Sequence, residues 1–352
     1  MRFALEIGPG AWLKPDGVQQ SIELARTAEQ AGFDTIWASE DPDGWDAFGA
    51  LAVLGRRTER IHLGTGVTNP YLRHPNLIAA SVATLDRSSD GRAFLGLGRG
   101  EPDWYRTAFG MDIGSPLKRV EETVKLLRQW WSPEQVAASE GEITVRNWRR
   151  EFRPLGTPPI YLAATGQKMQ TLAGRIADGV RFNTLASLPF LKRSVAAVQE
   201  GASRAHRPLA NIRVFANPNL TITERDDQIE NVLESKKTTI ALIHALPGMD
   251  QQLLGLESEF DIEAILAEVR RHMRTAEILA RGGSFADLRR EGDLPSARKA
   301  IPTALVDQVA LVGPVDRVRR RLKEYAALGI TDVFVDPAQL QDADQINELR
   351  LL

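Results

Sequence analysis

The chain has 352 residues, of which 43% are hydrophobic and 26% are charged. This length exceeds the roughly 250 residues of a bare (β/α)8 barrel, and the composition is that of a globular protein that needs no metal or disulfide to stabilise its core. The 44 basic and 46 acidic residues leave a formal charge of -2, so nucleic acid is not an expected partner, and the absence of cysteine excludes disulfides, thiolate catalysis and cysteine-ligated metal centres.

The first residues of the chain do not predict a targeting signal. The apolar run from Met1 to Gly8 is short and is interrupted by Glu6, so it does not resemble the apolar region of a signal peptide. No stretch approaches the length of a membrane span. We therefore expect a cytoplasmic protein with no membrane partner.

Short apolar runs alternate with amphipathic segments along the chain, as expected when crossover helices separate parallel strands. The runs near 160–164 and 332–335 are almost continuously apolar, which suits strands that are covered on both faces. Eight strands are predicted, and this number favours an α/β protein with a (β/α)8 TIM barrel, an open doubly wound sheet being the alternative. The predicted strands are 2–8, 34–39, 60–67, 92–98, 159–164, 178–183, 211–217 and 331–336.

Two stretches interrupt this alternation. Residues 139–156 combine a β-prone run with clustered arginines, which predicts a hairpin insertion before the fifth strand. Residues 225–330 are mostly helical in pattern and predict an enlarged crossover before the last strand. We expect one domain over residues 1–352 that carries both insertions.

Candidate site residues are those that close each apolar run, because the active site of such a barrel lies at the carboxyl ends of its strands. The third strand ends in Gly64, Thr65, Gly66, Val67 and, two residues on, Asn69. Two glycines here indicate a bulge or a backbone that approaches a flat ligand closely, with an ordinary tight loop as the alternative.

Glycines also follow the fourth and fifth strands. Gly98 lies in a G-x-G-x-G run far from the first strand, so a Rossmann nucleotide loop is rejected. After the fifth strand, Ala164 leads into Thr165, Gly166, Gln167 and Lys168, where a helix begins. Free backbone N–H groups and the helix dipole favour a phosphate there, although an ordinary helix cap fits the pattern too.

Glu6 is the charged residue that stands out by position. It lies inside an otherwise apolar first strand, and a carboxylate rarely enters a barrel interior unless it is paired or functional. We interpret it as a candidate general acid. The five histidines show no ligand spacing, so no metal site is predicted.

Taken together and in order, several motifs resemble those of the bacterial luciferase-like superfamily of flavin- and deazaflavin-dependent oxidoreductases, and most closely its methylenetetrahydromethanopterin reductase-like members. The resemblance covers most of the chain. It is carried by AEQAGFDTIWASE, IHLGTGVTNPYLRHPNLIAASVATLDRSSDGRAFLGLGRGE, PLKRVEETVKLLRQWW, PPIYLAATGQKMQTLAGRIADGV and VALVGPVDRVRRRLKEYAALGITDVFV.

The resemblance assigns roles to these positions. It implies a TIM barrel, a non-prolyl cis peptide between Gly66 and Val67 that bulges against the cofactor ring, and a phosphate site over 165–168. It also implies that the acidic pocket residues of the reductases match Glu6, Glu40 and Glu101. Many relatives have an Asp-His pair where this chain has Glu40 and Asp41, which argues against an alcohol dehydrogenase.

The function that the resemblance implies is hydride transfer between coenzyme F420 and a small organic substrate. An alternative is a two-component monooxygenase that binds reduced FMN, since the same fold and phosphate site would serve. A further alternative is a non-catalytic barrel, although Gly66 and Gly166 are both present. Relatives form dimers, so a homodimer is expected.

Overall fold

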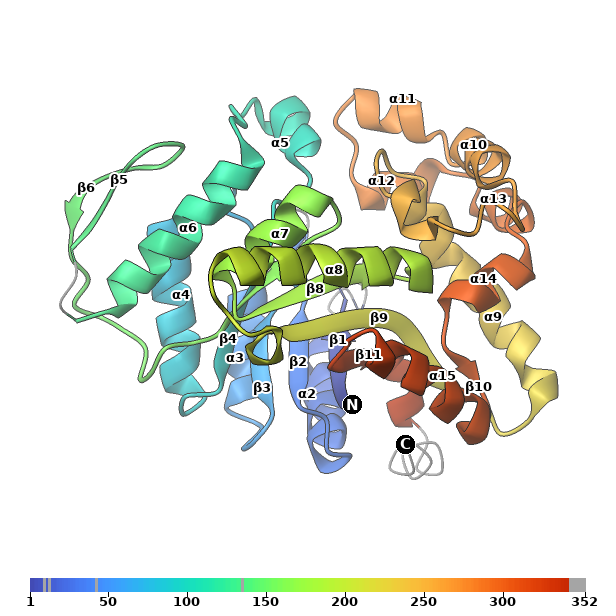
Figure 1. The fold of residues 1–352 in the computed structure, drawn as a ribbon, viewed down its shortest axis with the longest axis horizontal. Coiled ribbons are helices and arrows are strands. Elements are labelled where there is room, and N and C mark those ends of the chain that lie inside the picture. Colours follow the sequence, from blue (N-terminus) through green and yellow to red (C-terminus); the bar gives the residue numbers. More distant parts are fainter. Residues whose placement is uncertain (9–10, 12–13, 42–43, 134–135, 342–352) are drawn as a thin grey trace.

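A closed parallel barrel forms the centre of the molecule (Figure 1). The computed structural model describes residues 1–8, 11, 14–41, 44–133 and 136–341. Each barrel strand pairs with two neighbours, and β9 closes the ring by pairing with both β8 and β11. In order around the barrel the strands are β1 (Arg2–Ile7), β2 (Thr35–Ala38), β3 (His62–Thr65), β4 (Ala93–Leu97), β7 (Ile160–Ala163), β8 (Gly179–Thr184), β9 (Arg213–Ile222) and β11 (Asp332–Val335).

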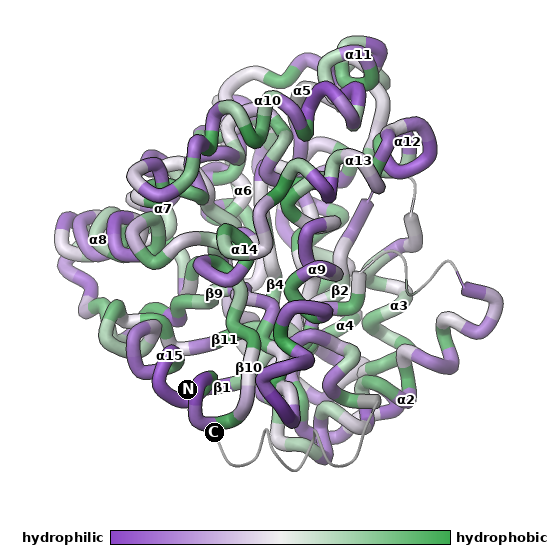
Figure 2. The backbone as a smooth tube through the Cα atoms, turned by 90° about the vertical axis from the view of Figure 1, so that its right-hand side faces the viewer, coloured by the Kyte–Doolittle hydropathy of each residue, from purple (hydrophilic) through white to green (hydrophobic). Residues whose placement is uncertain are grey.

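Helices cross between successive strands. In Figure 2 the largely hydrophilic α12 and α15 lie at the periphery. Among the residues that the structure describes, none of the helices is long and apolar enough to cross a membrane. The crossover helices are α2 (Gly17–Gln30), α3 (Ala47–Gly55), α4 (Pro75–Ser88), α5 (Pro102–Phe109), α6 (Pro116–Trp131), α7 (Gln167–Ile176), α8 (Leu188–Arg204) and, after the insertion, α15 (Val315–Ala327).

The predicted (β/α)8 barrel is confirmed, and the open-sheet alternative is wrong because the sheet closes. The predicted hairpin is also present, as β5 (Ala137–Glu140) and β6 (Thr144–Trp148), but it starts and ends earlier than 139–156. The predicted seventh strand stopped too soon: β9 continues to Ile222 because its end pairs with the short strand β10 (Val312–Gly313). A two-residue strand leaves no periodic signal, so β10 was not predicted.

Aromatic side chains fill the inside of the barrel. The buried Trp37 indole lies with its ring centroid 4.6 Å from that of Phe94 and 5.0 Å from that of Phe215. Tyr161 and Phe334 complete this cluster. Most of the rings meet in tilted or edge-on arrangements, and those of Trp37 and Tyr161 are stacked. Edge-on and offset-stacked geometries are favourable for aromatic pairs. This aromatic cluster fills the barrel interior.

The helical insertion between β9 and β11 forms a second hydrophobic core next to the barrel, on the right in Figure 1. Buried Lys236 attaches it: the Nζ atom donates to Asn219 Oδ1 at 2.6 Å, to Thr221 Oγ1 at 2.8 Å and to Asp336 Oδ2 at 3.0 Å. The insertion comprises α9 (Ile229–Thr239), a π-helical turn (Ile240–His244), α10 (Ile262–His272), α11 (Thr275–Ala280), α12 (Phe285–Glu291), α13 (Leu294–Lys299) and α14 (Thr303–Val309).

Ser187 provides a test of how the barrel holds this insertion. Its buried Oγ accepts from Phe190 N at 3.1 Å as the N-cap of α8 and donates to the Leu254 carbonyl at 2.7 Å. Ser187→Ala should lower the free energy of unfolding by about 1–2 kcal/mol, because it removes a cap and leaves a carbonyl without its donor. Urea unfolding measures the loss.

Ser115→Ala is the matched control, because Ser115 caps α6 through one long contact of 3.5 Å to Lys118 N. It should cost about 0.5 kcal/mol. Equal losses for the two variants would contradict the role of Ser187 as a link to the insertion.

Candidate active site

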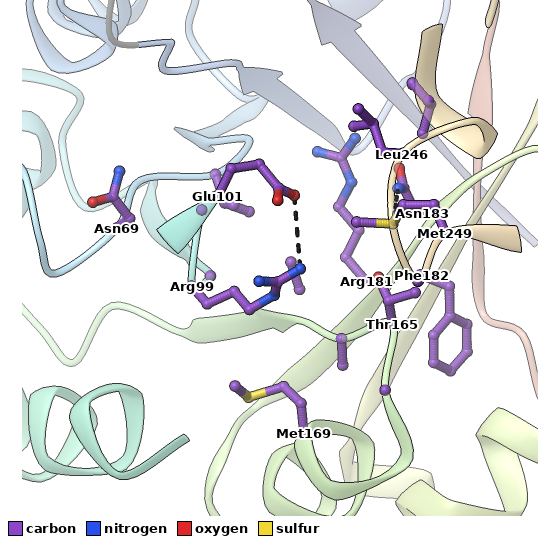
Figure 3. Close-up of a pocket in the computed structure, with 18 of the residues that line it drawn as sticks. Asn69, Arg99, Glu101, Thr165, Met169, Arg181, Phe182, Asn183, Leu246 and Met249 are labelled. Atoms are coloured by element: carbon purple, nitrogen blue, oxygen red, sulfur yellow. Dashed lines mark hydrogen bonds and ion pairs between the residues drawn. The ribbon is translucent and has the colours of Figure 1, made fainter. Parts of the chain in front are cut away.

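A cavity of about 980 Å³ lies over the carboxyl ends of the barrel strands, at the upper end of the size range of small-molecule sites (Figure 3). Barrel loops form one part of its wall and the helical insertion forms the other. The predicted site residues that line it are Glu6, Glu40, Gly66, Val67, Asn69, Gly98, Glu101, Ala164, Thr165, Gly166, Gln167 and Lys168.

The loop after β3 reaches the cavity through its last residues. The peptide bond between Gly66 and Val67 is cis, as the family resemblance implied. Gly98 makes room for this loop, because a Cβ on Gly98 would lie 2.8 Å from Val67 Cγ2. Gly66 and Val67 therefore form a cavity surface from backbone and one small side chain.

Gly64 and Thr65 belong to the barrel wall and are not among the lining residues. A Cβ on Gly64 would lie 2.3 Å from the Phe94 ring, so this glycine makes room for the aromatic cluster. Thr65 is fully buried and its Oγ1 donates to the Gly96 carbonyl at 2.6 Å. Both residues support the loop from below.

The loop after β7 presents the amino end of α7 to the cavity. Gly166 is the N-cap residue, no acidic residue lies in the first helical turn, and a Cβ on Gly166 would have nothing within 4 Å. Behind the loop, Gln170 Nε2 donates to the Thr165 carbonyl at 2.8 Å and to Ser194 Oγ at 2.9 Å. The loop is thus held in place while its open side suits an anion.

Glu6 is only partly buried, with 25% of its side chain exposed, and donors surround its carboxylate. Oε1 accepts from Ser39 Oγ at 3.0 Å, and Oε2 accepts from Arg181 Nη2 at 2.6 Å and from Asn217 Nδ2 at 3.4 Å. These donors fix the orientation of the carboxylate. Glu6 is therefore paired, and it also lies at the cavity.

The two other carboxylates face the same cavity from the loops after β2 and β4. Glu40 accepts from the Thr68 hydroxyl and from Arg73 Nε, the latter at 2.8 Å. Glu101 lies with Oε1 3.7 Å from Arg99 Nη2, the ion pair drawn in Figure 3. Each of the three predicted carboxylates thus has a guanidinium partner that restricts its orientation.

Sequence reasoning missed several residues of this wall. Arg181 lies within the largely apolar strand β8 and lines the cavity. A charged residue within an apolar run was the reason for selecting Glu6 in β1, and the same reasoning would have selected Arg181. Leu246 and Met249 come from the insertion, whose amphipathic pattern does not show which face meets the barrel. Tyr105 also lines the cavity, and burial raises its pKa to about 12, so its hydroxyl stays protonated at neutral pH.

The sequence of the chain is similar to those of known oxidoreductases along most of its length. The chain matches the luciferase-like monooxygenase family over residues 2–332 and belongs to it. The 5,10-methylenetetrahydromethanopterin reductase of Methanolobus tindarius is 30% identical over 335 residues, covering 95% of this chain and 93% of the relative. The protein is therefore an enzyme of the flavin- and F420-dependent oxidoreductases and acts on small substrates.

Solved structures support the fold. The coenzyme F420-dependent tetrahydromethanopterin reductase from Methanopyrus kandleri has a TM-score of 0.75 at 24% identity, over 99% of this chain and 96% of that one. The oxygenating constituent of 3,6-diketocamphane monooxygenase from Pseudomonas putida, solved with FMN, has a TM-score of 0.69 at 19% identity, over 100% and 96%. The same barrel thus occurs in a protein named as F420-dependent and in one solved in complex with FMN.

Proposed function

We propose that the protein is a coenzyme F420-dependent oxidoreductase that transfers a hydride between the deazaflavin and a small organic substrate. The observation that carries this proposal is the meeting, in one cavity, of the Gly66–Val67 surface, the α7 amino terminus at Gly166 and three carboxylates. Full-length similarity to a methylenetetrahydromethanopterin reductase supports it. The bound deazaflavin would supply the hydride chemistry at its C5 atom.

The residues of the chain have separate tasks in this proposal. Thr165, Gly166 and Lys168 would hold the cofactor phosphate, using backbone N–H groups and one positive side chain. Gly66 and Val67 would support the ring, and the insertion would exclude water from above. Glu6, Glu40 and Glu101 are the candidates for proton transfer to the substrate, oriented by their arginine partners.

A second candidate is a two-component monooxygenase that binds reduced FMN. It is favoured by the likeness to a structure solved with FMN and by the phosphate loop, which suits either cofactor. The two candidates differ in what binds: F420 carries a long acidic tail beyond its phosphate, and FMN does not.

The deciding experiment is a separate titration of the purified protein with F420 and with FMN, each oxidised and reduced, followed by absorbance and fluorescence. Tighter binding of F420 supports the hydride-transfer reductase and justifies a screen of reducible substrates. A preference for reduced FMN favours the monooxygenase. If neither cofactor binds, the cofactor assignment is wrong and the non-catalytic barrel becomes the better description.

We also propose that the protein forms a homodimer. Large apolar side chains lie exposed on and just after the hairpin: Trp148 is 55% exposed, Phe152 is 46% exposed and Leu155 is 60% exposed. Apolar groups gathered on a surface favour contact with another protein surface. Light scattering should therefore give a molecular mass twice that of the chain, and the mass of one chain would contradict the proposal.

A further inference from the structure

The side of the cavity that the insertion forms is largely apolar. Leu242, Leu246 and Met249 line it, and all three residues are buried. Trp104 of α5 and Phe285 of α12 also line the cavity and meet edge-on, with ring centroids 4.8 Å apart. Leu246 and Met249 are among the residues labelled in Figure 3. This apolar wall offers a surface for the apolar body of a ligand.

One cation of the cavity wall has no partner in the protein. The described residues that line the cavity include the cationic side chains of Arg99, Lys168, Arg181 and Arg289. Arg99 and Arg181 each pair with a carboxylate of the wall, at 3.7 Å and 2.6 Å between nitrogen and oxygen. Lys168 belongs to the loop proposed to hold the phosphate. Arg289 forms no hydrogen bond or ion pair with any residue that the structure describes, so its charge is available to a ligand.

The sequence of α12 explains why Arg289 is left without a partner. The two acidic residues of this helix, Asp287 and Glu291, both bind Arg290, and Glu291 also binds Arg281. Neither carboxylate pairs with Arg289. Arg289 follows Phe285 by four residues, so the two side chains lie on one face of the helix, the face that lines the cavity. A single helix therefore presents an aromatic ring and an unpaired guanidinium to the same space.

We propose that the substrate of this enzyme has an apolar body and one anionic group, such as a carboxylate, a sulfonate or a phosphate. The apolar body packs against the wall that includes Trp104 and Phe285, and Arg289 binds the anion. Arginine suits this task because its planar fork of donors matches two oxygens of such a group. Arg289 is thus a specificity-determining residue. This inference rests on the proposed function, because it names the substrate class of that same site.

The test uses two fluorescent dyes that share an apolar aromatic body and differ in charge. Anilinonaphthalenesulfonate carries one sulfonate, and N-phenylnaphthylamine is uncharged. In Arg289→Gln the affinity for the sulfonate dye should fall by roughly tenfold, the size expected for a lost charged hydrogen bond, and the affinity for the uncharged dye should stay as in the wild type. Arg289→Lys keeps the charge without the fork and should lose less. The readout is the ratio of the two dissociation constants, because a merely structural defect weakens both dyes alike.

Arg290 offers a matched control. It is the next residue of the same helix and is exposed like Arg289, but it pairs with Asp287 and Glu291 and is not among the residues that line the cavity. Arg290→Gln should leave the affinities for both dyes as in the wild type. Phe285→Ala tests the apolar wall and should weaken both dyes by a similar factor, because both share the body that the ring contacts.

Several outcomes would overturn the inference. One is an unchanged ratio in Arg289→Gln, and another is a wild type that does not bind the sulfonate dye. Dye bound instead at the exposed apolar groups on and after the hairpin would respond neither to Arg289→Gln nor to Phe285→Ala, and this result also contradicts it. If Arg289→Gln weakens F420 as much as it weakens the sulfonate dye, Arg289 binds the acidic tail of the cofactor and not the substrate.

The dye titrations are independent of the cofactor, so the two proposals fail separately. A wild type that binds neither F420 nor FMN overturns the proposed function, whereas the dyes still report whether the cavity selects an apolar anion. If Arg289→Gln does not fold, the salt dependence of the wild type decides. Added salt should weaken binding of the sulfonate dye and not of the uncharged one, because salt screens a charge pair at an exposed side chain. Equal salt dependence of the two dyes would overturn the inference.

Discussion

Replacing Gly166 with aspartate should weaken F420 binding by roughly a hundredfold, or about 2.7 kcal/mol, while the protein stays folded. The new carboxylate would lie at the amino end of α7, where the phosphate is proposed to bind, and two negative charges about 4 Å apart repel by about 4 kcal/mol near a protein surface. The fold tolerates the change because a Cβ at Gly166 meets nothing within 4 Å and because aspartate is a favourable N-cap residue.

Gly166→Asn is the matched control, since asparagine has the same size and caps a helix as well but carries no charge. Fluorescence titration of both variants isolates the effect of charge. We expect Gly166→Asn to bind F420 within a few-fold of the wild type. Equal affinities for the two variants would show that the phosphate does not bind at this helix end, whatever cofactor the enzyme uses.

The barrel was predictable because its strands are short apolar runs and most of its crossovers are amphipathic. The ends of the strands were harder to predict where a strand ends because its pairing partner ends. This is so at Ile222 in β9, which pairs with Gly313 in β10. The insertion was recognised as helical, but its docking was not predicted, since Lys236 reaches Asp336 across a hundred residues of sequence. Long-range contacts of this kind leave no periodic mark in the chain.

The site was predictable to the extent that it follows strand ends. Gly66 and Val67 line the cavity while Gly64 and Thr65 do not, because β3 ends at Thr65 and the last two residues of the strand pack against β4. An apolar run in the sequence does not show at which residue the strand ends. Arg181, like Glu6, is a charged residue within an apolar run, but only Glu6 was predicted as a site residue on that ground. These particular roles remain proposals for the experiments above to decide.

A buried histidine beside the cavity gives the enzyme an acid-sensitive element. His244 ends the π-helical turn whose Leu242 and Ile243 line the cavity, and it is fully buried. Its Nε2 lies 3.1 Å from the Leu185 carbonyl, and Nδ1 finds no hydrogen-bond partner among the residues that the structure describes. Burial lowers the pKa of this imidazole from 6.5 to about 4.

The free energy of unfolding should therefore fall by roughly 2 kcal/mol between about pH 7.5 and about pH 5 on account of His244. Below about pH 6.5 the unfolded chain binds a proton at this position, whereas the folded chain excludes it until about pH 4, so stability decreases as the pH falls through that window. His244→Phe removes the titrating group and should flatten this part of the profile, at a cost of about 1 kcal/mol at neutral pH for the lost contact with Leu185.

Urea unfolding at a series of pH values measures the effect, with His206→Asn at an exposed histidine as the control. The control should keep the slope of the wild type. If His244→Phe keeps it as well, another group causes the acid sensitivity and the burial of His244 has no such consequence. If the slope is lost, a buried histidine that stays neutral stabilises the folded protein at neutral pH, and mild acid removes that stability.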